Sequence, residues 1–456
     1  MSTFQATILA AGQGTRIKSK KIKIMHEVCG RPIIEWVVSC ALDAGATRVV
    51  PILGYQKELV AEHLVHVFGD RIAIAEQTEQ LGTGHAVFSA LEQLEGYEET
   101  TVVLSGDVPN LRPGTLAAFL SACHGKPGLI TAVLEDAKHY GRIIREHDIV
   151  NRIVEYKDAS PTEREIKEIN AGFYAFETAA LGTALRELLA SEPSNAQGEY
   201  YLTDLVETLG PCVGWILDDH TEMAGVNTRV DLAEAVGIAR DRINRFWMMS
   251  GVTMLNPETV HIDAEAKIGQ DVLIHGNVEI LGPSRIGADT IVQSGSVIEN
   301  TRIGERVTIK PCCHLESSSV DDESQIGPFA HLRPDADIGK GCKVGNFVEV
   351  KKVRMDDGSK ANHHAYLGDG HVGKKANIGA GTIFCNYDGK NKHFTDIGEG
   401  VFIGSNSALV APLKIEAGAY VGAGSTITND VPKDALAVAR GKQRNIEGWA
   451  RRKNGE

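Results

Sequence analysis

The sequence predicts a two-part chain, an α/β region with a mostly parallel sheet followed by a parallel β-helix built from hexapeptide repeats. In the first half, short apolar runs alternate with longer amphipathic stretches. In the second half, aliphatic residues recur every six positions, and the 456 residues include 48 glycines, above the average share of about 7%. At about 150 residues per domain, this length favours two or three domains and excludes a single small binding module.

Composition limits the ligands and the location of the protein. Lys and Arg total 47 against 60 Asp and Glu, a formal net charge of −13, which argues against broad affinity for nucleic acid or anionic membranes. The N-terminus has no signal-peptide pattern, and no apolar run approaches the roughly 20 residues that span a bilayer. We therefore expect a cytoplasmic protein without membrane insertion. The eight cysteines contain no C-x-x-C pair, so neither a metal cluster nor a disulfide framework is expected.

Residues 1–227 are predicted to form the α/β domain. Apolar runs separated by helix-length stretches predict strands with crossover helices, and ligands of such sheets bind beyond the carboxyl ends of the strands. Residues 228–250 have apolar positions at helical spacing and no Gly-Pro breaks, and are predicted to be a helical linker. The predicted strands are Thr7–Ala10, Val49–Leu53, Val102–Leu104, Leu129–Leu134 and Asn170–Phe176.

Residues 251–456 are predicted to form the β-helix domain. Aliphatic residues recur in steps of six from Ile262 to Ile298 and from Ile397 to Ile427. Each step predicts one short strand and a turn, with the aliphatic side chain inside the coil. The repeat breaks at 352–371, a polar segment with histidines at 363, 364 and 371, which we expect to be a loop that carries function. The basic tail from residue 440 is either a solvated terminus or a lid for an anionic ligand.

The turn after the first predicted strand, LAAGQGTR at residues 9–16, is neither a P-loop nor a dinucleotide-binding fingerprint. Its glycines allow backbone N–H groups to approach a phosphate or a base, and Arg16 and Lys23 add positive charge. Asp107 follows an apolar strand, where a carboxylate has little structural purpose unless it caps the next helix.

These segments resemble those of a known family. Eight segments of the first half are similar to those of the sugar-nucleotide pyrophosphorylases. They are LAAGQGTRIKSKKIKIMHEVCGRPI at 9–33, LGTGHA at 81–86, SGDVP at 105–109, YGRI at 140–143, IVEYKD at 153–158, EINAG at 168–172, NAQGEYYLTD at 195–204 and GVN at 225–227. Together with GSKA at 358–361, YLGD at 366–369, NIGAGT at 377–382 and NYDG at 386–389, the whole chain resembles the bacterial bifunctional N-acetylglucosamine-1-phosphate uridylyltransferases and glucosamine-1-phosphate N-acetyltransferases. The resemblance implies a left-handed β-helix and a homotrimer with shared acetyltransferase sites. From the residues alone, a monofunctional pyrophosphorylase with a structural β-helix and a non-catalytic scaffold remain alternatives.

For the first site, the resemblance implies that Asp107 and Asn227 hold Mg²⁺. Arg16 and Lys23 would neutralise charge while N-acetylglucosamine-1-phosphate attacks the α-phosphorus of UTP. No general base is needed, because a phosphate with a second pKa of about 6 is already ionised. Substrate contacts are implied for Lys23, Asn227, Leu9, Ala10, Ala11, Gly12, Gln77, Gly82, Thr83, Gly141, Glu155 and Asn170.

For the second site, a histidine suits removal of a proton from the amine of glucosamine-1-phosphate. The resemblance implies that His363 is this base and that Glu349 orients it or assists its charge. The adjacent His364 is a competitor for the role. Arg333 and Lys351 would clamp the sugar phosphate, and Tyr366 and Asn377 would hold the sugar. Acetyl-CoA would contact Ala380, Asn386, Tyr387, Ser405, Ala423 and Arg440, with the Ser405 N–H facing the oxyanion.

The sequence departs from the family pattern at four places near these sites. Ile22 stands where a proline usually precedes the lysine, and Lys138-His139 stand before Tyr140 where a glycine is common. Asn362 and His364 replace a glycine and a leucine beside His363.

Overall fold

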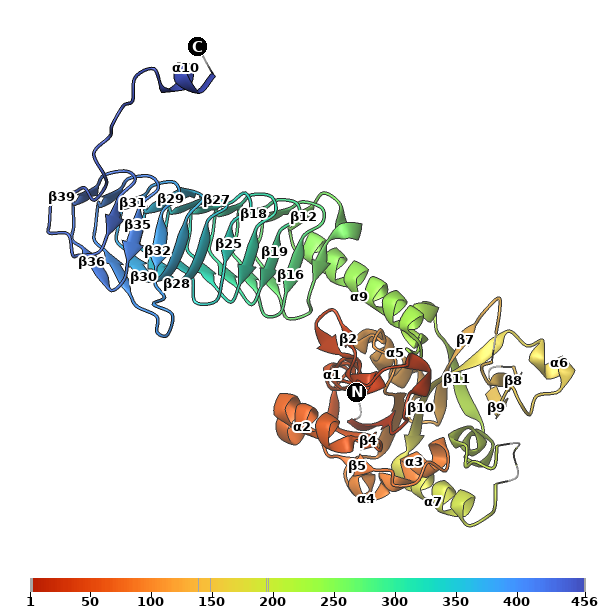
Figure 1. Cartoon of the computed structure of the whole chain (residues 1–456). Coiled ribbons are helices and arrows are strands. Elements are labelled where there is room, and N and C mark those ends of the chain that lie inside the picture. The colour runs from red at the N-terminus through yellow and green to blue at the C-terminus, as the bar shows by residue number, and fades with distance from the viewer. Residues whose placement is uncertain (1–2, 138, 148, 194, 196, 455–456) are drawn as a thin grey trace. The chain divides into compact units, whose positions relative to one another are not determined.

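The computed structural model describes residues 3–137, 139–147, 149–193, 195 and 197–454 (Figure 1). Lys138, one of the departures noted above, lies outside the described residues. The chain divides into two compact units, Met1–Ala239 and Arg240–Glu456, which are described separately. Within the described ranges, no helix combines the length and the apolar character needed to cross a membrane.

The first unit is built on a nine-stranded sheet in the order β5-β4-β1-β6-β10-β7-β11-β9-β8. All five predicted strands are present in it. The sheet is parallel from β5 to β6 and mixed beyond, because β10 runs antiparallel to both β6 and β7. The strands are β1 Phe4–Ala10, β4 Ala46–Leu53, β5 Ala75–Glu76, β6 Thr100–Ser105, β7 Gly128–Val133, β8 Arg142–Glu146, β9 Ile149–Val154, β10 Glu168–Glu177 and β11 Cys212–Ile216; the hairpin β2 Glu27–Val28 and β3 Arg31–Pro32 lies apart.

Two hydrophobic cores cover the two faces of this sheet. Val102 and Leu104 of β6 belong to one core and Val103 to the other, as the two-residue period of a strand requires. The helices that complete the cores are α1 Ile33–Asp43, α2 Lys57–Phe68, α3 Thr83–Ser89, α4 Leu91–Leu94, α5 Pro113–Cys123, α7 Thr178–Leu189 and α8 Leu205–Thr208, and a further short helix is α6 Pro161–Arg164. Because β1 and β6 pair in parallel, with Leu9 opposite Ser105, the loops that follow both strands emerge side by side.

Helix α9 (Arg229–Met249) occupies the segment predicted to be helical, and the division between the two units falls inside it. In the second unit, its residues Ile243 and Trp247 pack against the core of the β-helix. The buried Asn244 donates hydrogen bonds to the carbonyl oxygens of Pro257 (2.8 Å) and Val260 (2.9 Å). The end of α9 thereby covers the first coil.

The second unit is a left-handed parallel β-helix with three faces (Figure 1). One face is an eleven-stranded sheet, formed by β12 Thr253–Met254, β15 Leu273–Ile274, β18 Ile291–Val292, β21 Thr308–Ile309, β24 Gln325–Ile326, β27 Lys343–Asn346, β29 Lys360–His363, β31 Asn377–Ile378, β34 Phe402–Ile403, β37 Tyr420–Val421 and β39 Leu436–Ala437. A short helix, α10 Trp449–Asn454, follows in the exposed tail.

The other two faces form one seventeen-stranded sheet, because the long strands β28 and β30 run across the corner between them. Its strands are β13 His261–Ile262, β14 Lys267–Ile268, β16 Glu279–Leu281, β17 Arg285–Ile286, β19 Val297–Glu299, β20 Arg302–Ile303, β22 His314–Glu316, β23 Ser319–Val320, β25 His331–Leu332, β26 Asp337–Ile338, β28 Glu349–Met355, β30 Tyr366–Val372, β32 Ile383–Cys385, β33 Thr395–Ile397, β35 Ala408–Val410, β36 Leu413–Ile415 and β38 Thr426–Ile427.

The aliphatic residues of the six-residue period, from Ile262 to Ile427, all lie in one buried core, which confirms the reading of the repeat. The predicted loop at 352–371 is wrong, because β28, β29 and β30 continue the coils through it. Ala361, Leu367 and Val372 take the inward positions there, and the small Ala361 hid the period. The excursion from the coil is instead the segment 386–394, between β32 and β33.

Candidate functional site

Four polar side chains meet beyond the carboxyl ends of β1 and β6. The Lys23 ammonium donates to Asp107 Oδ2 at 2.5 Å and to Asn227 Oδ1 at 3.2 Å. The guanidinium of Arg16 also donates to Asn227 Oδ1, at 2.9 Å. The side chains of Lys23 and Asp107 are 13% and 23% exposed, so the cluster is open enough to admit a ligand but partly shielded from water.

Backbone contacts hold this cluster in place. Gly14 has a φ of +64°, and a Cβ there would lie 2.6 Å from Lys23 Cβ, so only glycine lets the turn close over the lysine. The amide of Val226 donates to the carbonyl of Asp107 (2.8 Å), which ties the Asn227 segment to the loop after β6. Asp231 accepts from the amide of Asn227 at 2.9 Å. Sequence reasoning missed Asp231, although it lies one helical turn after Asn227.

The donor atoms in this cluster fit a hard divalent cation. Asp107 and Asn227 present oxygens that converge on one positive charge, the Lys23 ammonium. Mg²⁺ commonly takes one or two protein oxygens and completes its shell with water and substrate phosphates. Among the described residues no three His, Cys, Asp or Glu side chains gather as a metal site, so two ligands are what this pair can supply. The alternative of Asp107 as a helix cap is wrong, because Arg112 occupies the N-cap of α5.

The loop at 77–84 lies beside the Gly-rich turn. Gln80 donates to the carbonyl of Ala11 at 2.9 Å and so joins the two loops. The buried Gln77 donates to the carbonyl of Gly82 at 3.1 Å. The Thr83 hydroxyl accepts from the amide of Leu202 at 3.0 Å. This region of the site is therefore preorganised by its own hydrogen bonds, and the turn residues Leu9, Ala10 and Gly12 lie at its edge.

Gly141, Glu155 and Asn170 also come together. The amide of Asn170 donates to the carbonyl of Gly141 at 2.9 Å, and a Cβ on Gly141 would lie 3.4 Å from Glu155 Oε1. Burial raises the pKa of Glu155, and a hydrogen bond from Thr203 partly opposes this. The Asn170 side chain donates to the Tyr174 hydroxyl at 2.6 Å. Burial, followed by the charges of Asp107 and Asp231, raises the pKa of the Tyr140 hydroxyl, which links this group to the first cluster.

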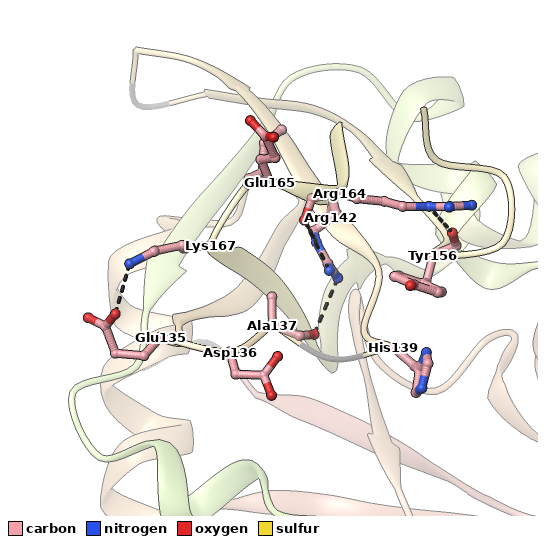
Figure 2. Close-up of a pocket in the computed structure, with 10 residues that line it drawn as sticks. Glu135, Asp136, Ala137, His139, Arg142, Tyr156, Arg164, Glu165 and Lys167 are labelled. Atoms are coloured by element: carbon pink, nitrogen blue, oxygen red, sulfur yellow. Dashed lines mark hydrogen bonds and ion pairs between the residues drawn. The ribbon is translucent and has the colours of Figure 1, made fainter. Parts of the chain in front are cut away.

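A separate pocket of about 670 Å³ lies next to the 140–143 segment (Figure 2). Arg142 donates to the carbonyls of Ala137 and Arg164 at 3.3 Å, and the guanidinium of Arg164 lies 4.8 Å from the Tyr156 ring centre. His139 meets the same ring edge-on at 4.7 Å. The departure at His139 is thus accommodated by a ring contact that packs the loop before Tyr140.

In the second unit, His363 lies at the end of β29, beside a pocket of about 420 Å³. Its Nδ1 lies 2.7 Å from Oδ1 of Asn346, which is its register partner on β27. The pocket is lined by Lys310, Gln325, Gly327, Pro328, Lys343, Val344, Gly345, Asn346, Lys360, Asn362 and His363. Asn362 and His363 therefore share one pocket, while the ring of His364 lies 5.0 Å from that of Phe347.

A cationic group lies along β28 and β30. Arg333 donates to Glu349 at 2.7 Å, and Glu349 is paired in register with Tyr366. The charge of Lys392, followed by that of Arg333, lowers the pKa of Lys351. Glu349 binds Arg333 and Asn346 binds the His363 ring, so the role of Glu349, in orienting His363 or assisting its charge, stays a prediction. Sequence reasoning missed Asn346 and Lys392, and only the register of the coils reveals them.

Three of the implied acetyl-CoA residues, Ala380, Ser405 and Ala423, form a column at one corner of the β-helix, whereas Asn386 and Tyr387 lie in the excursion between β32 and β33. Strand pairing places Asn377 opposite Lys360 and Phe402 opposite Asn377, so that successive coils bring His363, Ala380 and Ser405 into line. Ala423 follows on the next coil, and its carbonyl accepts from Arg440 at 2.8 Å. Asn386 donates to Asp369 at 2.5 Å, and Tyr387 is exposed.

The fold and these two sites define a nucleotidyltransferase unit joined to a hexapeptide-repeat transferase unit. Residues 6–196 match the family model of the MobA-like NTP transferase domain. Residues 265–300, 317–352 and 394–429 match that of the bacterial transferase hexapeptide with six repeats.

The chain belongs to the family of the bifunctional GlmU proteins. It is 46% identical over 462 residues to "Bifunctional protein GlmU" of Listeria monocytogenes serotype 4a, an alignment that covers 100% of this chain and 99% of the relative. The protein of the same name from Pelobacter propionicus is 46% identical over 98% of both chains. That of Geotalea uraniireducens is 43% identical over 99% of this chain and 100% of its own.

Proposed function

We propose that the protein acetylates glucosamine-1-phosphate with acetyl-CoA and then transfers UMP from UTP to the N-acetylglucosamine-1-phosphate formed. The products are UDP-N-acetylglucosamine, coenzyme A and pyrophosphate. The observation that carries this proposal is that two chemically complete clusters lie in two separate units, one around Lys23, Asp107 and Asn227 and the other around His363.

In the first unit, the site must bring two polyanions together in a protein of net negative charge. Lys23 and Arg16 would shift from Asn227 and Asp107 onto the phosphates and offset charge as pyrophosphate leaves. Asp107 and Asn227 would hold Mg²⁺, which supplies charge neutralisation on the triphosphate. Gln77, Gly82 and Thr83 would fix the base, and Gly141, Glu155 and Asn170 the sugar. Catalysis is then mainly positioning and charge stabilisation, as is general for phosphoryl transfer.

In the second unit, His363 would accept a proton from the ammonium group of the sugar, so that the neutral amine attacks the thioester carbonyl. The C–N bond forms, the C–S bond breaks, and the proton on His363 passes to the departing thiolate. The second proton that the nitrogen loses as the amide forms passes to water. Arg333 and Lys351 would bind the sugar phosphate, with Tyr366 and Asn377 on the sugar. The Ser405 N–H would stabilise the tetrahedral oxyanion, and Ala380, Asn386, Tyr387, Ala423 and Arg440 would line the path of the coenzyme.

The proposed assembly is a homotrimer, and the proposed location is the cytoplasm. Support for assembly comes from the β-helix itself, whose exposed faces carry large apolar side chains such as Phe402 and Tyr420. Light scattering on the purified protein would give the subunit number. The proposed substrates are small molecules, and no nucleic acid or membrane partner is proposed.

The test is product analysis with glucosamine-1-phosphate, acetyl-CoA, UTP and Mg²⁺, repeated with each reactant left out. Asp107→Asn is expected to abolish uridylyl transfer and to spare acetylation, and His363→Ala to do the reverse. Loss of both activities in one folded variant would count against separate sites. Absence of coenzyme A release by the unmodified protein would reduce the second unit to an assembly platform.

A further inference from the structure

Asn346 and His363 occupy neighbouring coils and touch through their side chains. We infer that Asn346 is a positioning residue for acetyl transfer, holding the His363 ring in the one tautomer that can accept the proton of the amine. This inference rests on the proposed acetyltransferase function. Its structural basis is the contact of 2.7 Å between Asn346 Oδ1 and His363 Nδ1, between residues that β27 and β29 place in register.

The atoms in this contact decide where the proton of the ring lies. An amide oxygen can only accept a hydrogen bond, so Nδ1 must be the donor. A neutral imidazole carries one N–H, and the partner of one ring nitrogen sets the state of the other. With Nδ1 protonated, Nε2 keeps its lone pair and is free to act as the base. Register pairing of β27 and β29 limits movement of the ring relative to Asn346.

The amide at position 346 is uncharged, so it does not stabilise a positive charge on the ring. The charged side chains that line this pocket are Lys310, Lys343 and Lys360, and no carboxylate is among its lining residues. An aspartate at 346 would stabilise the imidazolium and raise the pKa of the base. Asparagine orients the ring without placing a negative charge beside it.

The same contact distinguishes His363 from the adjacent His364. The His364 ring packs against Phe347 at 5.0 Å, and its backbone has a left-handed φ of 44°. In the described part of the chain, the His364 ring has no recorded hydrogen bond that would set its tautomer. Only His363 therefore combines a fixed tautomer with a position on the pocket.

The first test measures coenzyme A release against pH for Asn346→Ala and Asn346→Asp. Asn346→Ala is expected to lower kcat about tenfold or more, because the base is no longer oriented. The KM values for glucosamine-1-phosphate and acetyl-CoA are expected to change little, because no substrate contact is removed. Asn346→Asp is expected to move the acidic limb of the profile up by about one pH unit and to recover rate at high pH. An unshifted limb in Asn346→Asp, or full kcat in Asn346→Ala, would overturn the inference.

Gln325→Glu is the matched control for charge. It adds a carboxylate to the same pocket two strands away from His363, roughly 10 Å at the usual strand spacing and beyond a Debye length of about 8 Å. Its acidic limb is expected to stay close to that of the unmodified protein. Retained uridylyl transfer in all three variants reports that each protein is folded.

A second readout does not depend on catalysis. Diethyl pyrocarbonate acylates neutral imidazole, and tandem mass spectrometry resolves modification at His363 from that at His364. In Asn346→Asp the pH midpoint for His363 is expected to rise, whereas that for His364 stays nearer its original value. If the unmodified protein releases no coenzyme A, the proposed function fails, while an equal His363 midpoint in both proteins refutes the role of Asn346.

Discussion

Replacing Glu222 with alanine should both weaken the first unit and impair its chemistry. The Glu222 side chain is 1% exposed and accepts from the Arg112 amide (2.9 Å), from Arg112 Nε (2.8 Å) and from the Thr115 hydroxyl (3.0 Å), with a further bond from Arg112 Nη2. It therefore joins α5 to the segment that leads to Asn227. Truncation leaves the Arg112 amide and the Thr115 hydroxyl without their acceptor.

The magnitude follows from what each partner can do afterwards. Breaking a buried ion pair usually costs about 3–5 kcal/mol, and each orphaned buried donor about 1–3 kcal/mol. The Arg112 side chain is 52% exposed, so its guanidinium can be rehydrated. The loss comes mainly from the two part-buried donors, the Arg112 amide and the Thr115 hydroxyl. We expect Glu222→Ala to lower the free energy of unfolding of the first unit by about 3 kcal/mol.

Urea titration read by hydrogen-exchange mass spectrometry on peptides of β1 and β6 would isolate the first unit. Glu135→Ala is the control, because Glu135 pairs with Lys167 at 2.8 Å but is 96% exposed, and no measurable shift is expected there. Uridylyl transfer should fall in Glu222→Ala as Asn227 loses its support, with acetylation unchanged. A midpoint equal to that of the Glu135 variant would refute the reasoning.

Two further predictions concern the β-helix. In Gly345→Ala the new Cβ would lie 1.9 Å from the carbonyl oxygen of Asn362, a backbone clash that should lower the urea midpoint of the second unit sharply; an unchanged midpoint would contradict the packing. His371 lies between Asp396 (3.0 Å) and Asp356 (2.9 Å), and although burial opposes its charge, these bonds raise the pKa of His371. Its stabilisation is therefore complete below the unfolded pKa of about 6.5 and is lost as pH rises through the higher folded pKa. The Tm measured between pH 6 and 9 should fall as this stabilisation is lost, which amounts to under about 1 kcal/mol because the His371 side chain is one-third exposed. His371→Gln should remove this fall, and an equal slope of Tm against pH in both proteins would refute the prediction.

The order of the two units and most of their strands could be predicted because periodicity records burial directly. Aliphatic residues, Ile262 among them, recur wherever a side chain must point into the coil. The prediction failed at 352–371 because Ala361 fills an inward position with too little apolar surface to register as aliphatic. Sequence spacing also could not indicate that β10 runs antiparallel within the sheet.

The charged residues of the candidate sites could be predicted from motifs, but their partners could not. Asp107 and Lys23 are 84 positions apart in sequence, and nothing in either motif states that Lys23 donates to both Asp107 and Asn227. Asn346 precedes His363 by 17 positions, one coil of the β-helix, a spacing with meaning only once the register is known. The sequence therefore did not reveal the supporting residues, although it revealed the residues that they support.

The corner column of the β-helix spans a fixed distance along the second unit. From His363 through Ala380 and Ser405 to Ala423 and the neighbourhood of Arg440, each coil advances by one strand spacing of about 4.8 Å, so four steps measure about 19 Å. Under the proposed function, a carrier that reaches from His363 to the last coil must have an arm of comparable length. Adding or deleting a whole coil would change that distance by one strand spacing while leaving every other turn in register, so the number of repeats sets the length of the column.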